Sequence, residues 1–183
     1  MGGGRSCRLS ITGLQYPPRT QGMHTKENNT HDSHGYTEPV VTVQEVCAEY
    51  FYRSGSHYLF YEEQPEGCPA VLKTRIKRKG GTVEICRQGV MGSNMVFEAG
   101  GRYRTEYPTP FGTLLLDIVT EAVEVEEDDS VRALPDDMPD ADGSGWRDVK
   151  ISYLLENQGE IMGEYELSIR KLPVDEAADG IEK

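Results

Sequence analysis

Long apolar runs, signal sequences and paired cysteines are all missing from the 183-residue sequence. No run of 18 apolar residues occurs, so no helix is expected to span a bilayer. The start, MGGGRSCRLS, lacks the apolar segment of a secretory signal, which predicts an intracellular, cytoplasmic protein. The four cysteines include no Cys-x-x-Cys spacing and are expected to stay reduced. With 37% apolar and 27% charged residues, the composition is that of a globular protein.

Recognisable catalytic and metal-binding motifs are missing too. We find no nucleophile elbow, no phosphate-cradling glycine loop and no paired-histidine zinc motif. His24, His31 and His34 crowd into one polar stretch, but its composition predicts a loop, which would not hold zinc ligands rigidly. The stretch Asp140–Gly143 resembles part of a calcium loop whose first and closing ligand positions carry apolar residues. We therefore assign no catalytic residue, no metal and no other cofactor.

Most of the negative charge lies in one segment. The formal net charge is −12, and the segment from Glu124 to Gly145 holds nine acidic residues and one arginine, a local charge of −8. Its prolines and glycines predict a solvated loop between two strands. The basic run from Lys73 to Lys79, KTRIKRK, is interpreted as a strand whose charges are balanced by nearby acids. Nucleic-acid binding is therefore not expected.

Short runs that alternate apolar and polar residues fill the rest of the chain. Positions 149–156 and 161–170 alternate on either side of a glycine-containing turn, as in a hairpin with one buried face. Similar runs occur at about 8–16, 39–53, 57–63, 71–79, 82–89, 94–99, 102–107 and 113–125. Small turn pairs such as Gly80-Gly81 and Gly100-Gly101 predict consecutive antiparallel hairpins from 39 to 125. About 8–10 such strands must hide their edges, so the predicted fold is all-β, a single antiparallel up-and-down β-barrel.

The hairpin around Gly80-Gly81 has a register that can be written down from the sequence. A two-residue turn pairs the residues on either side of it, and the pairing then continues down both strands. The predicted pairs are Lys79 with Thr82, Lys77 with Glu84, Ile76 with Ile85 and Thr74 with Arg87. Alternation puts Arg87 and Thr74 on the apolar face of this hairpin.

An arginine on an apolar face needs a carboxylate or several hydrogen bonds, because an unpaired buried charge is strongly destabilising. Glu62 and Glu63, which follow the aromatic run YLFY, are the nearest candidates. Alternation lets only one of the two face inward. We therefore take Arg87, Thr74, Glu62 and Glu63 as the candidate ligand-binding residues.

Five motifs occur in an order that resembles a known family. They are YLFYEE (58–63), TRIK (74–77), VEICRQG (83–89), MVF (95–97) and YPTPFGTLLL (107–116). From about Cys7 to Pro173 the chain resembles the YwiB-like family of small bacterial proteins, a domain of unknown function. The resemblance implies a calycin-like barrel, the architecture of lipocalins and fatty-acid-binding proteins, and it implies no activity. The positions that match the family pattern are Glu62, Glu63, Thr74, Arg87, Gly89, Phe97 and Gly112.

The length predicts one domain over residues 1–183. Within it we expect a core barrel at about 7–173 and a flexible tail at 174–183. Loop insertions at 17–38 and 126–145 are where the chain departs from the YwiB-like pattern.

Three functional classes stay open. A barrel of this size can enclose one small ligand, and Arg87 would offer a bidentate fork to an anionic or amphipathic one. Alternatively, Arg87 and a glutamate form a structural ion pair in a filled barrel, and the protein is a non-catalytic interaction or regulatory module with a protein partner. An enzyme is the third class, and no motif supports it. The volume of the barrel interior near Arg87 distinguishes the first two classes.

Overall fold

The computed structural model of the chain describes residues 5–17, 38–64, 70–89, 92–109, 111–126 and 147–173. Ten strands form one antiparallel sheet in the order β6-β5-β4-β3-β2-β1-β10-β9-β8-β7, which confirms the predicted all-β barrel. No helix in this described part has the length and apolar character that crossing a membrane requires. The strands are β1 (Arg5–Tyr16), β2 (Val40–Arg53), β3 (Ser56–Glu63), β4 (Leu72–Lys79), β5 (Thr82–Gln88), β6 (Ser93–Phe97), β7 (Arg102–Thr109), β8 (Gly112–Glu126), β9 (Asp148–Asn157) and β10 (Glu160–Leu172).

Several sequence predictions concern residues outside this described part. They are the histidine-containing stretch 24–34, most of the acidic loop, at 127–146, and the tail at 174–183.

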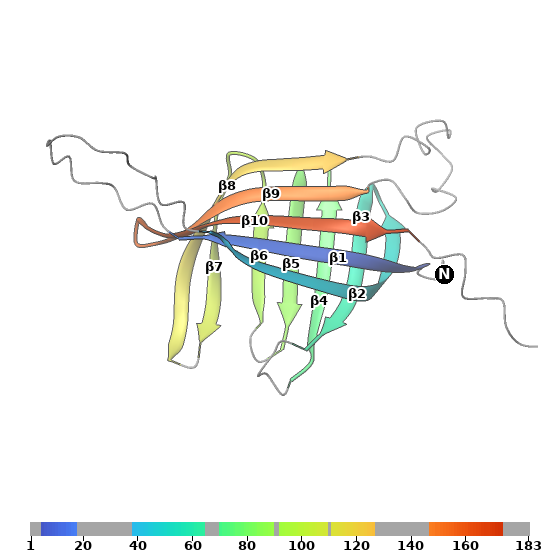
Figure 1. Ribbon diagram of the computed structural model, residues 1–183, viewed down its shortest axis with the longest axis horizontal. Coiled ribbons are helices and arrows are strands. Elements are labelled where there is room, and N and C mark those ends of the chain that lie inside the picture. The colour runs from blue at the N-terminus through green and yellow to red at the C-terminus, as the bar shows by residue number, and fades with distance from the viewer. Residues whose placement is uncertain are drawn as a thin grey trace, which may run out of the picture.

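The sheet curls into two layers that cross (Figure 1). Strands β1, β10 and β9 run side by side in one layer, and β3 to β6 cross behind them. Two long strands take part in both layers. The first part of β2 pairs with β1 and its last five residues pair with β3, while β8 pairs first with β7 and then with β9. A register shift between Thr120 and Ala122 marks the corner in β8, as bulges do where strands change layers.

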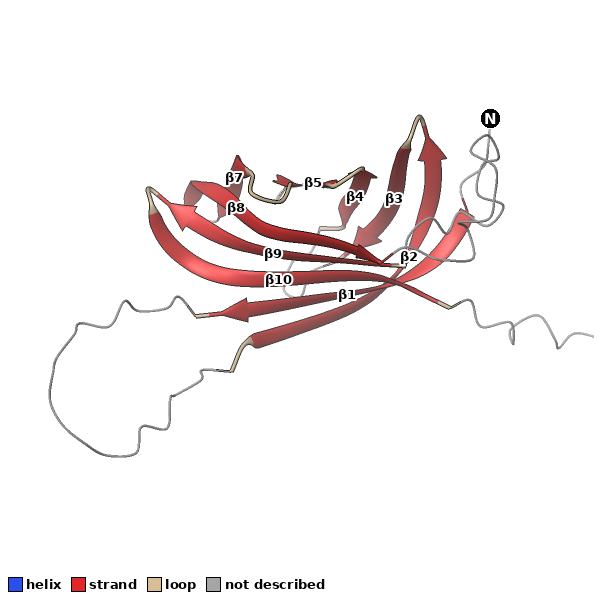
Figure 2. Ribbon diagram, turned by 90° about the horizontal axis from the view of Figure 1, so that it is seen from above, coloured by secondary structure: helices blue, strands red, loops and turns tan. Residues whose placement is uncertain are grey.

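The barrel has a seam between β6 and β7, where the sequence predicted a hairpin. The prediction was wrong at this one connection: no ladder joins these two strands among their described residues. The glycine pair explains the difference, because Gly100 donates its N–H to the carbonyl of Thr120, and Thr120 donates its N–H to the carbonyl of Gly101. The turn residues therefore extend the β7–β8 pairing, while β6 and β7 lie close together without a described ladder between them. Figure 2 shows the resulting cup from above.

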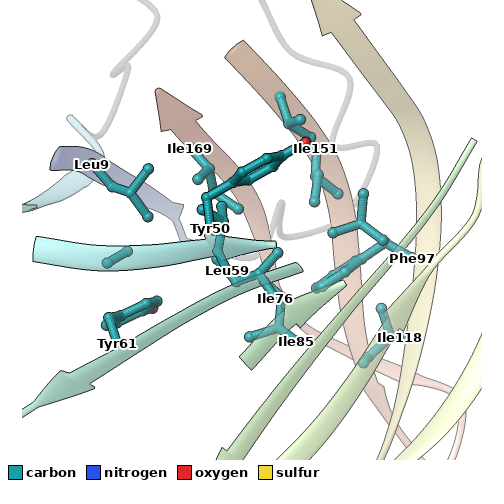
Figure 3. Packing of buried hydrophobic residues seen from close by; sticks show 13 residues of the cluster. Leu9, Tyr50, Leu59, Tyr61, Ile76, Ile85, Phe97, Ile118, Ile151 and Ile169 are labelled. Carbon is teal, nitrogen blue, oxygen red and sulfur yellow. The ribbon is translucent and has the colours of Figure 1, made fainter. Parts of the chain in front are cut away.

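Alternating residues of both layers fill the centre of the barrel. Leu9, Leu59, Phe97 and Ile118 are completely buried, and burial of each such side chain contributes about 1.5–3 kcal/mol to stability. The ring of Phe97 meets that of Tyr153 edge to face, with centroids 4.9 Å apart. Figure 3 shows side chains from both layers meeting in the middle, where they form one buried hydrophobic cluster.

Candidate ligand-binding site

The site begins with the register of the β4–β5 hairpin, which the structure confirms pair by pair. Lys79 lies opposite Thr82, Lys77 opposite Glu84, Ile76 opposite Ile85 and Thr74 opposite Arg87. Thr74 is on the inner face, with 2% of its surface exposed.

The two candidate glutamates lie on opposite faces of β3. Glu63 is the inward one, with only 8% of its surface exposed. Glu62 points outward, where its carboxylate lies 3.6 Å from the ammonium group of Lys73 and its side chain is 64% exposed. The structure therefore brings Glu63, Thr74 and Arg87 together and leaves Glu62 on the outer surface.

One carboxylate oxygen organises this inner cluster. The Nε–H of Arg87 donates to Oε1 of Glu63 at 2.9 Å, and the hydroxyl of Thr74 donates to the same oxygen at 2.7 Å. The Glu63 side chain is 7% exposed, whereas that of Arg87 is 36% exposed. In this ion pair the carboxylate is therefore buried and the guanidinium is partly exposed to solvent. Burial lowers the pKa of Arg87, but Glu63, with Tyr61 and Tyr107, raises it by more in total, so the guanidinium stays charged.

Tyr61 is a fourth member of the cluster. It lies opposite Thr74 in the β3–β4 ladder, and it is close enough to Glu63 and Arg87 for both charges to act on its hydroxyl. Burial, with a smaller contribution from the Glu63 carboxylate, raises the pKa of Tyr61 to about 12. The phenol is therefore protonated at neutral pH and can donate a hydrogen bond. Its place two residues before Glu63 on the same strand face would have identified it from the sequence.

A cleft opens beside this cluster where β2 and β3 separate. The two strands are paired from Arg53–Ser56 to Glu49–Phe60 and then diverge. The space between them is a cleft of about 840 Å³, lined by residues 44–49 of β2, residues 60–64 and, among others, Thr74. The inward residues Tyr61, Glu63 and Thr74 lie on its floor. Arg87 is bonded to Glu63 but is not among the described residues that line the cleft.

A second polar cluster, which the sequence did not reveal, surrounds His57 at the start of β3. The guanidinium of Arg78 donates to Nε2 of His57 at 3.0 Å, and Nδ1 lies 2.9 Å from the hydroxyl of Tyr50. Since arginine can only donate, Nε2 must be the accepting nitrogen, and the neutral ring carries its proton on Nδ1. Burial, together with the charges of Arg78 and Lys171, lowers the pKa of His57 to about 4. This histidine is therefore a neutral structural hydrogen-bonding group.

Comparison with known proteins decides the family. The model of a domain of unknown function, DUF1934, matches residues 24–169. The chain belongs to the DUF1934 family. The crystal structure of the ywiB protein from Bacillus subtilis is similar to this DUF1934 chain, with a TM-score of 0.53 and 15% sequence identity over 92% of this chain and 94% of that one. At this identity the similarity shows the fold, and it agrees with the YwiB-like resemblance of the motifs. No curated protein matches the sequence.

Proposed function

We propose that this DUF1934 protein is a binding protein without catalytic activity that takes up a small amphipathic ligand in the cleft between β2 and β3. The observation that carries the proposal is the cleft itself. Its volume of about 840 Å³ falls within the roughly 300–1,000 Å³ of typical small-molecule sites. Its walls combine apolar side chains of Val46, Ala48 and Phe60 with the buried polar groups of Glu63 and Thr74. Apolar walls with a few fixed polar groups are typical of ligand sites.

The chemistry of the ligand's polar head group can be inferred from which member of the ion pair lines the cleft. The Nε–H of Arg87 is already directed at Glu63. Of the two members of the pair, Glu63 is among the described residues that line the cleft and Arg87 is not, so a ligand there contacts the carboxylate. Of the anionic and amphipathic ligands expected from the sequence, the geometry supports an amphipathic one whose head group donates hydrogen bonds, such as a protonated amine.

The ion pair supports a second candidate function. Arg87 and Glu63 form an ion pair beside the buried hydrophobic cluster, as expected of a structural pair in a non-catalytic interaction module. In both candidate functions Arg87 holds the Glu63 carboxylate in place. The two functions differ in whether the cleft binds a small molecule. We place either function in the cytoplasm, because Cys7, Cys47 and Cys86 are free thiols, as a reducing compartment requires.

Two ligands with the same alkyl chain and opposite charge test the proposal. Isothermal titration calorimetry with dodecylamine and dodecanoate, both below their micellar concentrations, should detect binding of the amine and weaker or no binding of the acid. Glu63→Gln should weaken amine binding about tenfold or more, since a charged hydrogen bond is lost. Glu106→Gln, at an exposed position of β7 that does not line the cleft, is the control and should leave amine binding unchanged. Preferential binding of dodecanoate that disappears in Arg87→Met would contradict the proposal and restore Arg87 as the ligand's partner.

A further inference from the structure

The outer part of β2 has an edge with no neighbouring strand in the described structure. Strand β1 pairs with β2 from Val40 to Tyr50, but β3 reaches only as far as Glu49. We infer that this free edge is a strand-addition site for an extended segment of a partner protein that carries alternating β-branched and basic side chains. Part of this edge, around Glu45, also lines the proposed ligand cleft. Strand addition at the edge is a separate proposal and holds whether or not the cleft binds a small ligand.

The β2–β3 turn shows which backbone groups face this edge. Ser54 and Gly55 have φ values of 53° and 72°, so the turn is of type I′ with two central residues. The flanking residues Arg53 and Ser56 then exchange both backbone hydrogen bonds, and every second residue of β2 directs its N–H and C=O toward β3. No register shift interrupts β2. The residues that direct both groups toward the free edge are therefore Val41, Val43, Glu45 and Cys47.

The side chains along this edge are unlike those that usually keep an edge strand from pairing with another chain. Natural edge strands carry lysine, proline or bulges that discourage pairing with another chain. Here Val40, Val41 and Val43 are 63%, 56% and 65% exposed. β-Branched residues favour the extended conformation, so the strand is already in the geometry that an added strand needs. Backbone hydrogen bonds to such an edge give affinity, and alternate side chains give specificity.

The surroundings favour a single extended segment as the occupant. Strand β3 forms the opposite wall of the cleft beside residues 44–49 of β2, so an occupant of that part of the edge lies between two strands. One strand of a peptide enters such a space more readily than the edge of a second folded barrel. Four glutamates line the cleft against two cations, Lys73 and Arg75. Lysine or arginine side chains therefore complement that end of the edge, and β-branched side chains complement Val41 and Val43 at the other.

A seven-residue peptide tests the inference. In antiparallel pairing, the sequence Lys-Val-Lys-Thr-Val-Thr-Val places its third residue opposite Glu45, its fifth opposite Val43 and its seventh opposite Val41. A fluorescein-labelled copy is titrated with the full-length protein and followed by fluorescence anisotropy. N-methylation of the third and fifth residues removes two N–H groups that face β2 and should weaken binding about tenfold or more. N-methylation of the fourth and sixth residues, whose N–H groups face away, is the matched control and should change the affinity less than about twofold.

Protein variants and a mass measurement complete the test. Val43→Lys should weaken binding of the peptide, because it places a lysine on the edge opposite an apolar side chain and next to the peptide's own lysines. Equal effects of the two N-methylated peptides, or no binding of the parent peptide, would overturn the inference. Light scattering that shows a dimer in the wild-type protein and a monomer in Val43→Lys would also overturn it, since a second copy would then occupy the edge. Binding of dodecylamine is measured on the same samples, so a failure here is distinguishable from a failure of the proposed ligand cleft.

Discussion

Replacement of Arg87 by methionine tests the role of the ion pair at the cleft. The change keeps an apolar side chain of similar length and removes the N–H that donates to Glu63 at 2.9 Å. Glu63, whose side chain is 7% exposed, would keep its hydrogen bond from Thr74 but lose its counter-charge. Loss of one partner of a fully buried pair costs about 3–5 kcal/mol. Because the Arg87 side chain is 36% exposed and water screens part of the pair, we expect a smaller loss of about 2–3 kcal/mol.

Urea unfolding of a double-mutant cycle measures this loss. The variants are Arg87→Met, Glu63→Leu and the double replacement, and the double variant should recover much of the loss, with a coupling free energy of about 1–3 kcal/mol. Glu62→Leu is the control for removing a glutamate from β3, and it should be near neutral because Glu62 is on the outer face. An Arg87→Met variant as stable as the wild type, with no coupling to Glu63, would refute the argument that the pair fixes the carboxylate.

Two further predictions concern other parts of the barrel. The pKa of His57 is lowered from 6.5 to about 4, so its contribution to stability is complete above pH 6.5 and is lost as the pH falls toward 4, by about 1–2 kcal/mol after allowance for solvent screening. Urea unfolding at pH 7 and pH 4.5 should show this loss in the wild type, and an equal loss in His57→Gln would contradict the assignment. Replacement of residues 128–145 by a short glycine-serine turn should leave the barrel folded, because the N–H of Arg147 donates to the carbonyl of Glu126 at 2.7 Å and already joins the ends of the loop. Circular dichroism that shows a loss of strand structure would contradict it.

Local pattern was sufficient to predict most of the barrel. The β4–β5 register followed from one glycine turn and period-two alternation, and it placed Arg87 opposite Thr74 as the structure does. The motif resemblance also included Gly89 and Gly112, whose φ values of 137° and 128° only glycine adopts without strain. These features depend on residues close together in the chain.

The missed features depend on residues far apart in the chain. The turn at Gly100-Gly101 has a hairpin composition, but its backbone pairs with Thr120 in β8. The divergence of β2 from β3 follows from the pairing of β2 with β1, and no local signal marks residue 49 as the point of separation. Alternation showed that one of Glu62 and Glu63 faces inward, and the three-dimensional pairing was needed to choose Glu63.

Chemical-shift mapping of amine binding tests the central claim most directly. Isotope-labelled protein is titrated with dodecylamine, and the backbone amide shifts are recorded at each step. The account predicts that the largest shifts belong to residues on both walls and the floor of the cleft, among them Ala48, Tyr61, Glu63 and Thr74. Shifts confined to residues remote from the cleft, or no saturable shifts at all, would contradict the claim that the space between β2 and β3 is a ligand site.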